Sequence, residues 1–252
     1  ALIIRVASKL TDIPYSLTTH AHDLYQKPNK KLIVNLVRNS RFCVTISEYN
    51  KKYIISLEPT LKDKIYIIHC GVDVSQFKPV QREKSSEIKL FTVARLVETK
   101  GVDDVIAICS KIPSDITYKY NVVGGGPQQE ELETLILDKN LQQTVHLLGV
   151  KTQDEVLSLM QEADVFILFC KVGKDGNRDG IPVALMEAMA LQLPVISTKV
   201  SGIPELIKDG AGIIVEENDR EALLESIIEI CRMPPQQRQQ MGEIGRKIVE
   251  KE

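Results

Sequence analysis

The sequence predicts an α/β protein built on a doubly wound parallel sheet, and three observations support this prediction. Strand-like and helix-like segments alternate along all 252 residues. The later strand-like segments are almost wholly apolar, as parallel strands buried on both faces are. Six β-α units follow one another in the second part of the chain, which is typical of a doubly wound sheet.

Fewer helices and strands are predicted in the first part of the chain than in the second. Its β-rich runs are 13–20, 41–46 and 64–70, and its helical segments are 30–38 and 48–58. The opening run ALIIRVASKL carries Arg5 and Lys9 and lacks a basic leader, so it is interpreted as a helix rather than a signal peptide. A start within a helix suggests a chain that begins inside a larger protein. Residues 73–88 are polar, contain Pro79 and show no sustained period, which indicates a linker.

The second part predicts a regular alternation. The expected strands are 89–96, 117–124, 144–149, 164–169, 194–200 and 211–216, and the expected helices are 101–112, 128–139, 153–163, 182–191, 203–208 and 219–232. The final segment PPQQRQQMGEIGRKIVEKE predicts one more helix with a polar face. Ligands of such sheets bind beyond the carboxyl ends of the strands, so the β-to-α loops are the places to look for chemistry.

Composition excludes several classes of function. The chain is 43% apolar and 26% charged, as soluble globular proteins are. A net charge of -2 gives no general field for nucleic acid or an anionic membrane. Five scattered cysteines without a C-x-x-C pair favour a reducing cytosol over a disulfide framework or a zinc site. No run of about 18 apolar residues predicts a membrane span.

Two loops of the second part could contact a phosphate. Arg95 and Lys100 lie near the end of strand 89–96, just before a helix, where two cations and a helix N-terminus could bind an anion. Two solvated surface cations are an equally good interpretation. The Gly124–Gly126 run lets the backbone approach a ligand, but a tight turn explains it as well. Gln129 stands where a G-x-G-x-x-G dinucleotide pattern needs glycine, so an NAD site is disfavoured.

Residues 171–187 are the most informative stretch. The run from Asp175 to Gly180 begins like a calcium-binding EF-hand loop, but the twelfth position is Met186 rather than Glu, so calcium is strongly disfavoured. Glu187 is the only ionisable residue from Ile181 to Thr198 and lies in a nearly all-apolar helix. A buried carboxylate needs donors, and a ribose or sugar diol offers two hydroxyls. A backbone amide or a nearby cation would satisfy it too.

The neighbouring positions extend this site. Asp179 lies eight residues before Glu187, and Pro182 suits the first turn of the helix between them. Gly180 and Ile181 would then present free amides at a helix N-terminus, where anions bind. The loop 199–206 repeats the pattern with Ser201-Gly202 before a helix. Together these loops predict a ligand with a diphosphate and several hydroxyls, as a nucleotide-sugar has.

The same motifs carry a resemblance to a known family. The runs 179–182 (DGIP), 187–190 (EAMA), 194–198 (PVIST) and 201–205 (SGIPE) resemble the donor-binding core of family 4 retaining glycosyltransferases, of the bacterial exopolysaccharide or colanic-acid type. The runs 69–79, 94–101 and 124–127 match in the right order. The resemblance covers essentially the whole chain.

The resemblance implies a GT-B fold, in which two Rossmann-like domains face each other across a cleft. Residues 80–252 would form the complete nucleotide-sugar-binding domain, and residues 1–79 only the C-terminal part of the acceptor-side domain with the linker. The truncated chain would then bind the donor but transfer the sugar poorly. The expected localisation is cytoplasmic, with peripheral contact at the inner membrane face left open.

The resemblance also implies roles for individual residues. The catalytic group would comprise His20 (with His22 as a second candidate), Asp179, Arg95 and Lys100. The donor-binding group would comprise Gly124, Gly125, Gly126, Val150, Gly180, Ile181, Pro182, Val183, Glu187, Ser201 and Gly202. The family's Glu-x7-Glu pattern has Asp at its first position here, so the sugar contact at Asp179 is less secure than the ribose contact at Glu187.

The chain as a whole is therefore expected to be a retaining, metal-independent hexosyltransferase. No D-x-D triplet occurs, no cofactor is expected, and the donor would be a UDP- or GDP-sugar with a glycan or a lipid-linked acceptor. The rival hypothesis is a non-catalytic nucleotide-sugar-binding module. A GT-B epimerase is a weaker third, because its carboxylates are spaced differently.

Overall fold

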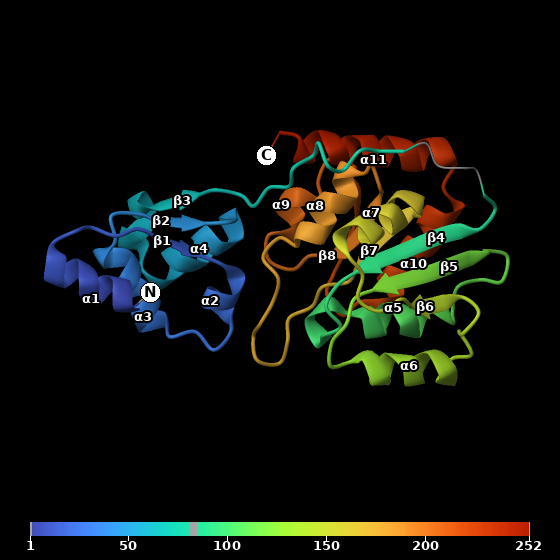
Figure 1. Cartoon of the computed structure of the whole chain (residues 1–252), viewed down its shortest axis with the longest axis horizontal. Coiled ribbons are helices and arrows are strands. Elements are labelled where there is room, and N and C mark those ends of the chain that lie inside the picture. Colours follow the sequence, from blue (N-terminus) through green and yellow to red (C-terminus); the bar gives the residue numbers. More distant parts are fainter. Residues whose placement is uncertain (1, 81–84, 252) are drawn as a thin grey trace.

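The computed structural model describes residues 2–80 and 85–251 and contains two parallel sheets, set side by side (Figure 1). The first sheet has the order β1-β2-β3 and the second β6-β5-β4-β7-β8-β9. The second order is that of a doubly wound sheet, so the predicted fold class is confirmed.

The first sheet is formed by β1 (Leu17–Thr19), β2 (Cys43–Thr45) and β3 (Ile65–Ile67), and its helices are α1 (Leu2–Thr11), α2 (Ala21–Tyr25), α3 (Lys30–Asn39), α4 (Glu48–Leu57) and the 3-10 turn η1 (Pro59–Lys64). The strands are shorter than predicted, because each pairs over three residues. The short helix α2 was not predicted. It follows β1 directly, since the Asp23 carboxylate accepts a hydrogen bond from the His20 amide (2.9 Å) and so caps the turn.

The second sheet follows the predicted alternation. Its strands are β4 (Ile88–Val93), β5 (Tyr118–Val123), β6 (Val145–Leu147), β7 (Val165–Leu168), β8 (Val195–Thr198) and β9 (Gly212–Val215). Its helices are α5 (Val102–Cys109), α6 (Gln129–Asp138), α7 (Gln153–Glu162), α8 (Val183–Ala190), α9 (Ile203–Leu206), α10 (Arg220–Arg232) and α11 (Pro235–Val249), with the 3-10 turn η2 (Glu98–Lys100) before α5. The six predicted strands and the six predicted helices of this part agree with the observed elements to within three residues at each end. The largest differences are at β4 and α5, which both end three residues early. After α5, the Lys111 and Ile112 amides turn back to the Ile108 and Cys109 carbonyls.

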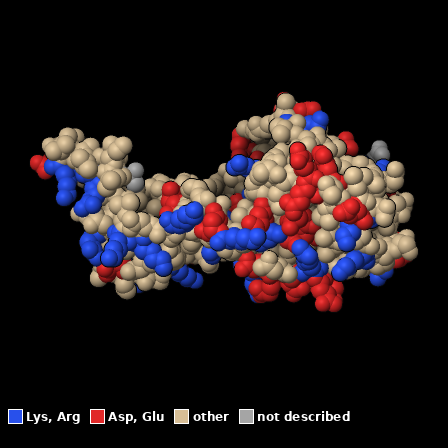
Figure 2. Space-filling view, turned by 90° about the horizontal axis from the view of Figure 1, so that it is seen from below, with Lys and Arg blue, Asp and Glu red and all other residues tan. Residues whose placement is uncertain are grey.

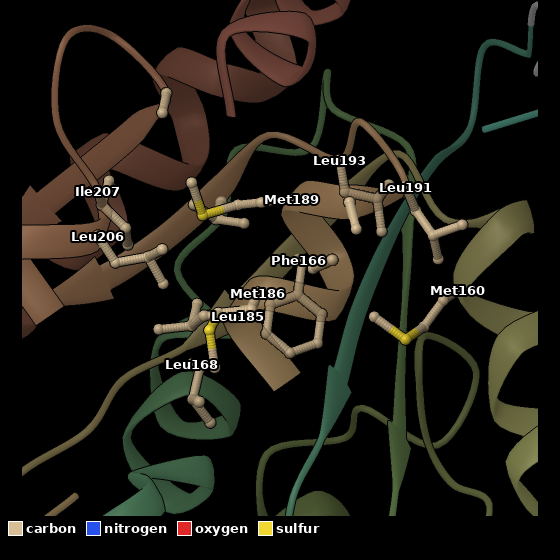
Figure 3. Close-up of a cluster of buried hydrophobic side chains, with 14 of the residues drawn as sticks. Met160, Phe166, Leu168, Leu185, Met186, Met189, Leu191, Leu193, Leu206 and Ile207 are labelled. Atoms are coloured by element: carbon tan, nitrogen blue, oxygen red, sulfur yellow. The ribbon is translucent and has the colours of Figure 1, made fainter. Parts of the chain in front are cut away.

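Helix α8 is held in the core of the second sheet. Phe166 of β7 packs with Leu185 and Met189 of α8 in one buried cluster (Figure 3). Helix α11 covers α8 from the other side, and Gly242 allows this, because a Cβ there would lie 2.1 Å from the Gln192 carbonyl oxygen. This packing sets the position and direction of the helix that carries Glu187.

The predicted linker is only partly irregular. Residues 81–84 lie outside the described residues, while Phe77 is buried against the second sheet and its carbonyl accepts a hydrogen bond from Arg246 (2.8 Å). Residue 88, predicted as the last of the linker, already belongs to β4, because the Ile88 amide donates a hydrogen bond to the Thr117 carbonyl (2.9 Å). The expected division between residues 79 and 80 stays a prediction.

The two parts of the chain differ in charge. Residues 1–79 contain 12 Lys and Arg against 6 Asp and Glu, and the rest contains 20 against 28. Figure 2 shows blue side chains gathered over the part with the first sheet and most red ones over the other part. The two parts therefore attract each other electrostatically. None of the described helices combines the length and the apolar character that a membrane crossing needs.

Candidate functional site

The candidate site lies at the carboxyl edge of the second sheet. The loops that leave β4, β5, β6, β7 and β8 all open toward the first sheet (Figure 1). Backbone hydrogen bonds join them pairwise: Leu96 to Gly125 (3.0 Å), Gly124 to Gly149 (2.9 Å), Lys171 to Thr99 (3.0 Å) and Gly202 to Gly180 (3.1 Å). Segments that the sequence analysis treated one by one thus form a single surface.

Lys100 and Asp179 meet at the centre of this edge. The Lys100 ammonium donates to Asp179 Oδ1 (2.8 Å), and both side chains are about four-fifths buried. The Cys170 thiol donates to the other oxygen, Oδ2 (3.4 Å). Lys100 belongs to η2, where Gly101 takes the left-handed conformation (φ 61°) and turns the chain into α5. The arrangement leaves a cation beside a carboxylate at the mouth of the sheet.

Arg95 follows β4, which ends two residues before it, rather than lying inside the predicted strand 89–96. Its side chain is exposed and makes no ion pair with any residue that the structure describes. Arg95 and Lys100 are separated by a turn, so the structure brings Lys100 to Asp179 and leaves Arg95 at the rim. Whether either contacts phosphate stays a prediction.

The glycine run after β5 has a packing reason. A Cβ at Gly124 would lie 1.8 Å from the Ala94 carbonyl oxygen, and one at Gly126 would lie 2.3 Å from that of Leu96. The loop after β4 therefore needs glycine at both places, which supports the tight-turn interpretation. Val150 projects beside Gly125 and is 79% exposed. Contact of these residues with a donor stays a prediction.

The start of α8 differs in one detail from the prediction. Pro182 is the N-cap rather than a residue of the first turn, because its carbonyl already accepts from Leu185 (3.1 Å). The Gly180 carbonyl accepts a hydrogen bond from the Gly202 amide, and Ile181 is buried. That the amides of Gly180 and Ile181 bind an anion stays a prediction. Val183, the first residue of α8, is 46% exposed and stands at the open end of the helix.

Glu187 lies one turn after Val183 on the same face of α8, and this face points away from the buried core. Its side chain is half-buried, and burial raises the pKa of its carboxyl above the ordinary value. Its carboxylate accepts no hydrogen bond from the residues that the structure describes. Satisfaction by a protein donor, the competing interpretation of Glu187, therefore has no support within the described part.

Ser201 adds a second unsatisfied group. It is buried, adopts a left-handed backbone (φ 51°) that few residues other than glycine tolerate, and its hydroxyl oxygen has no partner among the described atoms. A buried polar atom without a partner, in a strained loop, is typical of a binding site. Gly202 beside it must be glycine, because a Cβ would lie 2.8 Å from Ile181 and 3.0 Å from Ser47.

His20 lies on the facing part of the chain. It is the N-cap of α2 and its side chain is exposed, as is that of His22. Ala21, between the two histidines, lies 3.6 Å from the Cβ position of Gly180. The segment that carries His20 therefore borders the loop that carries Asp179, although a catalytic role stays a prediction.

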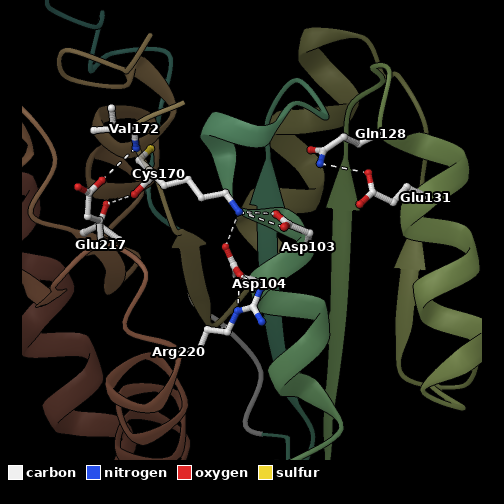
Figure 4. A network of polar contacts seen from close by, with 10 residues as sticks. Asp103, Asp104, Gln128, Glu131, Cys170, Val172, Glu217 and Arg220 are labelled. Atoms are coloured by element: carbon white, nitrogen blue, oxygen red, sulfur yellow. Dashed lines mark hydrogen bonds and ion pairs between the residues drawn. The ribbon is translucent and has the colours of Figure 1, made fainter. Parts of the chain in front are cut away.

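Sequence reasoning missed the ion cluster behind the site. The Lys171 ammonium donates to Asp104 (2.6 Å) and Asp103 (3.0 Å), and Asp104 also pairs with Arg220 (Figure 4). Burial alone would lower the pKa of Lys171, but its hydrogen bonds to Asp104 and Asp103 outweigh burial and raise it. The cluster fixes the start of the loop 171–181 to α5. The only signal in the sequence was the acidic pair at the start of α5, and this signal is weak because acidic residues are common in the first turn of a helix.

The stretch that resembles a calcium loop is already satisfied by protein donors. The Asn177 amide donates to Asp175 Oδ1 (2.9 Å), and Gln26 donates to Oδ2 (2.7 Å). Among the residues that the structure describes, no three His, Cys, Asp or Glu side chains are grouped as metal ligands. Asp175, which would be the first ligand of a calcium loop, thus forms a contact between the two parts of the chain.

Comparison with protein families and known sequences gives a consistent result. The family described as glycosyl transferases group 1 matches residues 73–248. The putative colanic acid biosynthesis glycosyltransferase WcaL of Escherichia coli (strain K12) is 40% identical over 169 residues, which are 66% of this chain and 42% of that protein. The amylovoran biosynthesis glycosyltransferase AmsK of Erwinia amylovora is 36% identical over 173 residues, 68% of this chain and 42% of that protein. The matched region thus spans about two fifths of these relatives.

Comparison with solved structures covers nearly the whole chain. Anabaena Alr3699/HepE, crystallised in complex with UDP, superimposes with a TM-score of 0.84 over 99% of this chain and 71% of that one, at 18% identity. A glycosyltransferase from Rickettsia africae ESF-5 gives 0.83 over 98% and 68%, at 20% identity. At such identities the likeness shows the fold, which is that of GT-B glycosyltransferases.

Proposed function

The chain belongs to the glycosyl transferases group 1 family, and from this premise we propose that it binds a nucleoside diphosphate sugar at the carboxyl edge of the second sheet. The transfer would be retaining and independent of metal. The observation that carries the proposal is the Glu187 carboxylate, half-buried and without a protein donor, one turn into a helix whose N-terminus opens on the same edge. Ribose hydroxyls are the donors that such a carboxylate lacks.

The chemistry follows from the charges at this edge. Lys100, with Arg95 at the rim and the N-terminus of α8, would stabilise the negative charge that develops on the leaving diphosphate. The Asp179 carboxylate would accept a hydrogen bond from a hydroxyl of the sugar while its Oδ1 remains paired with the Lys100 ammonium. The leaving diphosphate would take the proton of the attacking hydroxyl on the same face, so the anomeric configuration is kept. His20 would lie on the acceptor side of the sugar.

The identity of the ligands rests on the relatives. Solved structures of similar fold contain UDP or UDP-glucose, and curated relatives are named for exopolysaccharide biosynthesis. We therefore favour a UDP- or GDP-sugar as the donor and a growing glycan or lipid-linked sugar as the acceptor. We place the protein in the cytoplasm, at the inner membrane face when its acceptor is lipid-linked.

A second candidate is a module that binds the nucleotide-sugar without transferring the sugar. It is favoured by one observation, that the family match covers residues 73–248 and so includes the second sheet but not the first. The two candidates differ in turnover. Release of free sugar or transfer from a radiolabelled donor would establish the enzyme, and saturable binding without any turnover would establish the module.

A thermal-shift screen against UDP, GDP, ADP and their glucose or mannose derivatives tests the proposed function. A ligand specific for the folded chain stabilises it by about 2.7 kcal/mol at a hundredfold excess over its dissociation constant. We expect one diphosphate and its sugar to raise the unfolding temperature. A chain that responds to none of them would refute the proposal.

Metal independence gives a further prediction. Binding of the diphosphate that the screen identifies should be unchanged in excess EDTA, because Lys100 and the α8 N-terminus supply the positive charge that a metal would otherwise supply. Isothermal titration with EDTA, and then with added Mg²⁺ or Mn²⁺, measures this. A loss of affinity of tenfold or more in EDTA, restored by either ion, would contradict it.

A further inference from the structure

The loop between β7 and α8 stands between the two parts of the chain, with the first sheet on one side and the second on the other (gold in Figure 1). Two adjacent residues of this loop have partners on opposite sides. Asp179 pairs with Lys100 of the second sheet's edge, and Arg178 reaches the helices of the first sheet. Because one peptide unit separates them, a displacement of the loop backbone at one residue also displaces the other.

Arg178 contacts a tyrosine cluster, made of Tyr25, Tyr49 and Tyr53. The guanidinium carbon lies 4.7 Å from the centre of the Tyr25 ring, within the range of a cation–π contact, and Nη1 donates to the Tyr49 hydroxyl (3.4 Å). The rings support each other, with centroids 4.9 Å apart for Tyr25 and Tyr53 and 5.9 Å apart for Tyr25 and Tyr49. Tyr25 is buried and its hydroxyl donates to Asn50 (2.9 Å), so the platform is rigid.

Further contacts hold this loop, and the helix α9 that follows the next strand, against the first part of the chain. Gln26 donates to Asp175 (2.7 Å), and the loop backbone at Gly176 comes so close that a Cβ would lie 2.8 Å from the Tyr25 carbonyl oxygen. Glu205, after the next strand, accepts from the Glu48 and Tyr49 amides at the N-terminus of α4 (2.8 Å each). A carboxylate is favourable at that end of a helix.

The root of the loop is fixed on the other side. Lys171 is buried between Asp103 and Asp104 of α5, so the loop leaves the second sheet from a firm anchor. The residues between Lys171 and Arg178 are partly or fully exposed, apart from Gly173. The position of Asp179 is thus set by two contacts, that of Lys171 with α5 and that of Arg178 with Tyr25. The second contact is made with the first part of the chain.

We propose that Arg178 is a positioning residue that couples the tyrosine cluster to donor-sugar binding: its stacking on Tyr25 sets the loop so that Asp179 faces the sugar. This inference rests on the proposed function. Because only the sugar meets Asp179, the contact should matter for the nucleotide-sugar and hardly at all for the diphosphate alone.

A double-mutant cycle tests the coupling, with two ligand pairs as probes, UDP with UDP-glucose and GDP with GDP-mannose. Arg178→Ala and Tyr25→Leu should each weaken binding of the nucleotide-sugar about fivefold, the scale of a partly desolvated cation–π contact, and change binding of the diphosphate less than twofold. The double variant should be no weaker than the single ones. Tyr25→Phe keeps the ring and loses only the hydrogen bond to Asn50, so it should weaken binding less than Tyr25→Leu does. Arg232→Ala, which removes an exposed cation paired with Asp115, is the matched control.

Hydrogen exchange without ligand provides a second readout that does not depend on donor binding. Arg178→Ala should speed exchange of the Gly176 and Asn177 amides of the loop, while Arg232→Ala should not. Unchanged exchange, additive losses in the cycle, or equal losses for diphosphate and nucleotide-sugar would each overturn the inference alone. A wild-type chain that binds neither ligand pair would refute the proposed function, and the inference with it.

Discussion

Lys100→Ala should weaken binding of the nucleoside diphosphate about 10–100-fold and leave binding of the nucleoside unchanged, because a charge-assisted hydrogen bond is worth about 1.5–3 kcal/mol. The structure strengthens this expectation for Lys100, whose ammonium is held at the mouth of the sheet by Asp179. It also separates Lys100 from Arg95, which lies exposed at the rim. Arg95→Ala should therefore cost less, about threefold, as weakly held surface charges do. Isothermal titration with the diphosphate and the nucleoside measures both losses.

A suitable control for these variants is Lys119→Ala. Lys119 pairs with Glu87 (3.3 Å) at the opposite, amino end of the second sheet, so its loss changes net charge equally without touching the site. Equal losses for diphosphate and nucleoside in Lys100→Ala, or an equal loss in the control, would contradict the phosphate assignment.

Glu187→Gln should reduce affinity for the nucleotide about 10–100-fold while the fold survives, since the shape is kept and only the charged acceptor is lost. The same variant should slightly raise the unfolding temperature of the unliganded protein at neutral pH. Burial raises the pKa of Glu187, so the folded state binds its proton more tightly than the unfolded state. Stability from this group is therefore present at low pH and is lost as pH rises through the raised pKa. Gln removes that pH-dependent cost.

Thermal unfolding between about pH 4 and pH 8, with and without nucleotide, measures both effects for Glu187→Gln. Glu229→Gln is the control, because this glutamate is exposed in α10 on an element remote from the open edge. An unfolded Glu187→Gln, together with a wild type that nucleotide does not stabilise, would make Glu187 a structural residue and contradict its role in binding.

The architecture of the second sheet followed from local patterns in the sequence. The run 165–169 is apolar at every position and lies between two helical patterns, as a parallel strand buried between two helical layers does. Helix starts were predictable where capping residues are local, as at Thr152, whose hydroxyl accepts from the Glu155 amide. The first sheet was harder to predict, because its strands are three residues long and α2 depends on one carboxylate, that of Asp23.

The candidate site was predictable as a set of loops but not as an arrangement. Glu187 stood out as the lone ionisable residue of an apolar helix, and the loops had to converge, since parallel strands end at one edge. Neither the pairing of Lys100 with Asp179 nor the stacking of Arg178 on Tyr25 has any trace in local sequence. The first pair is 79 residues apart in the chain, and the second joins two different sheets. Periodicity records which side of an element is buried, whereas the partner across a gap is decided only by how whole elements pack.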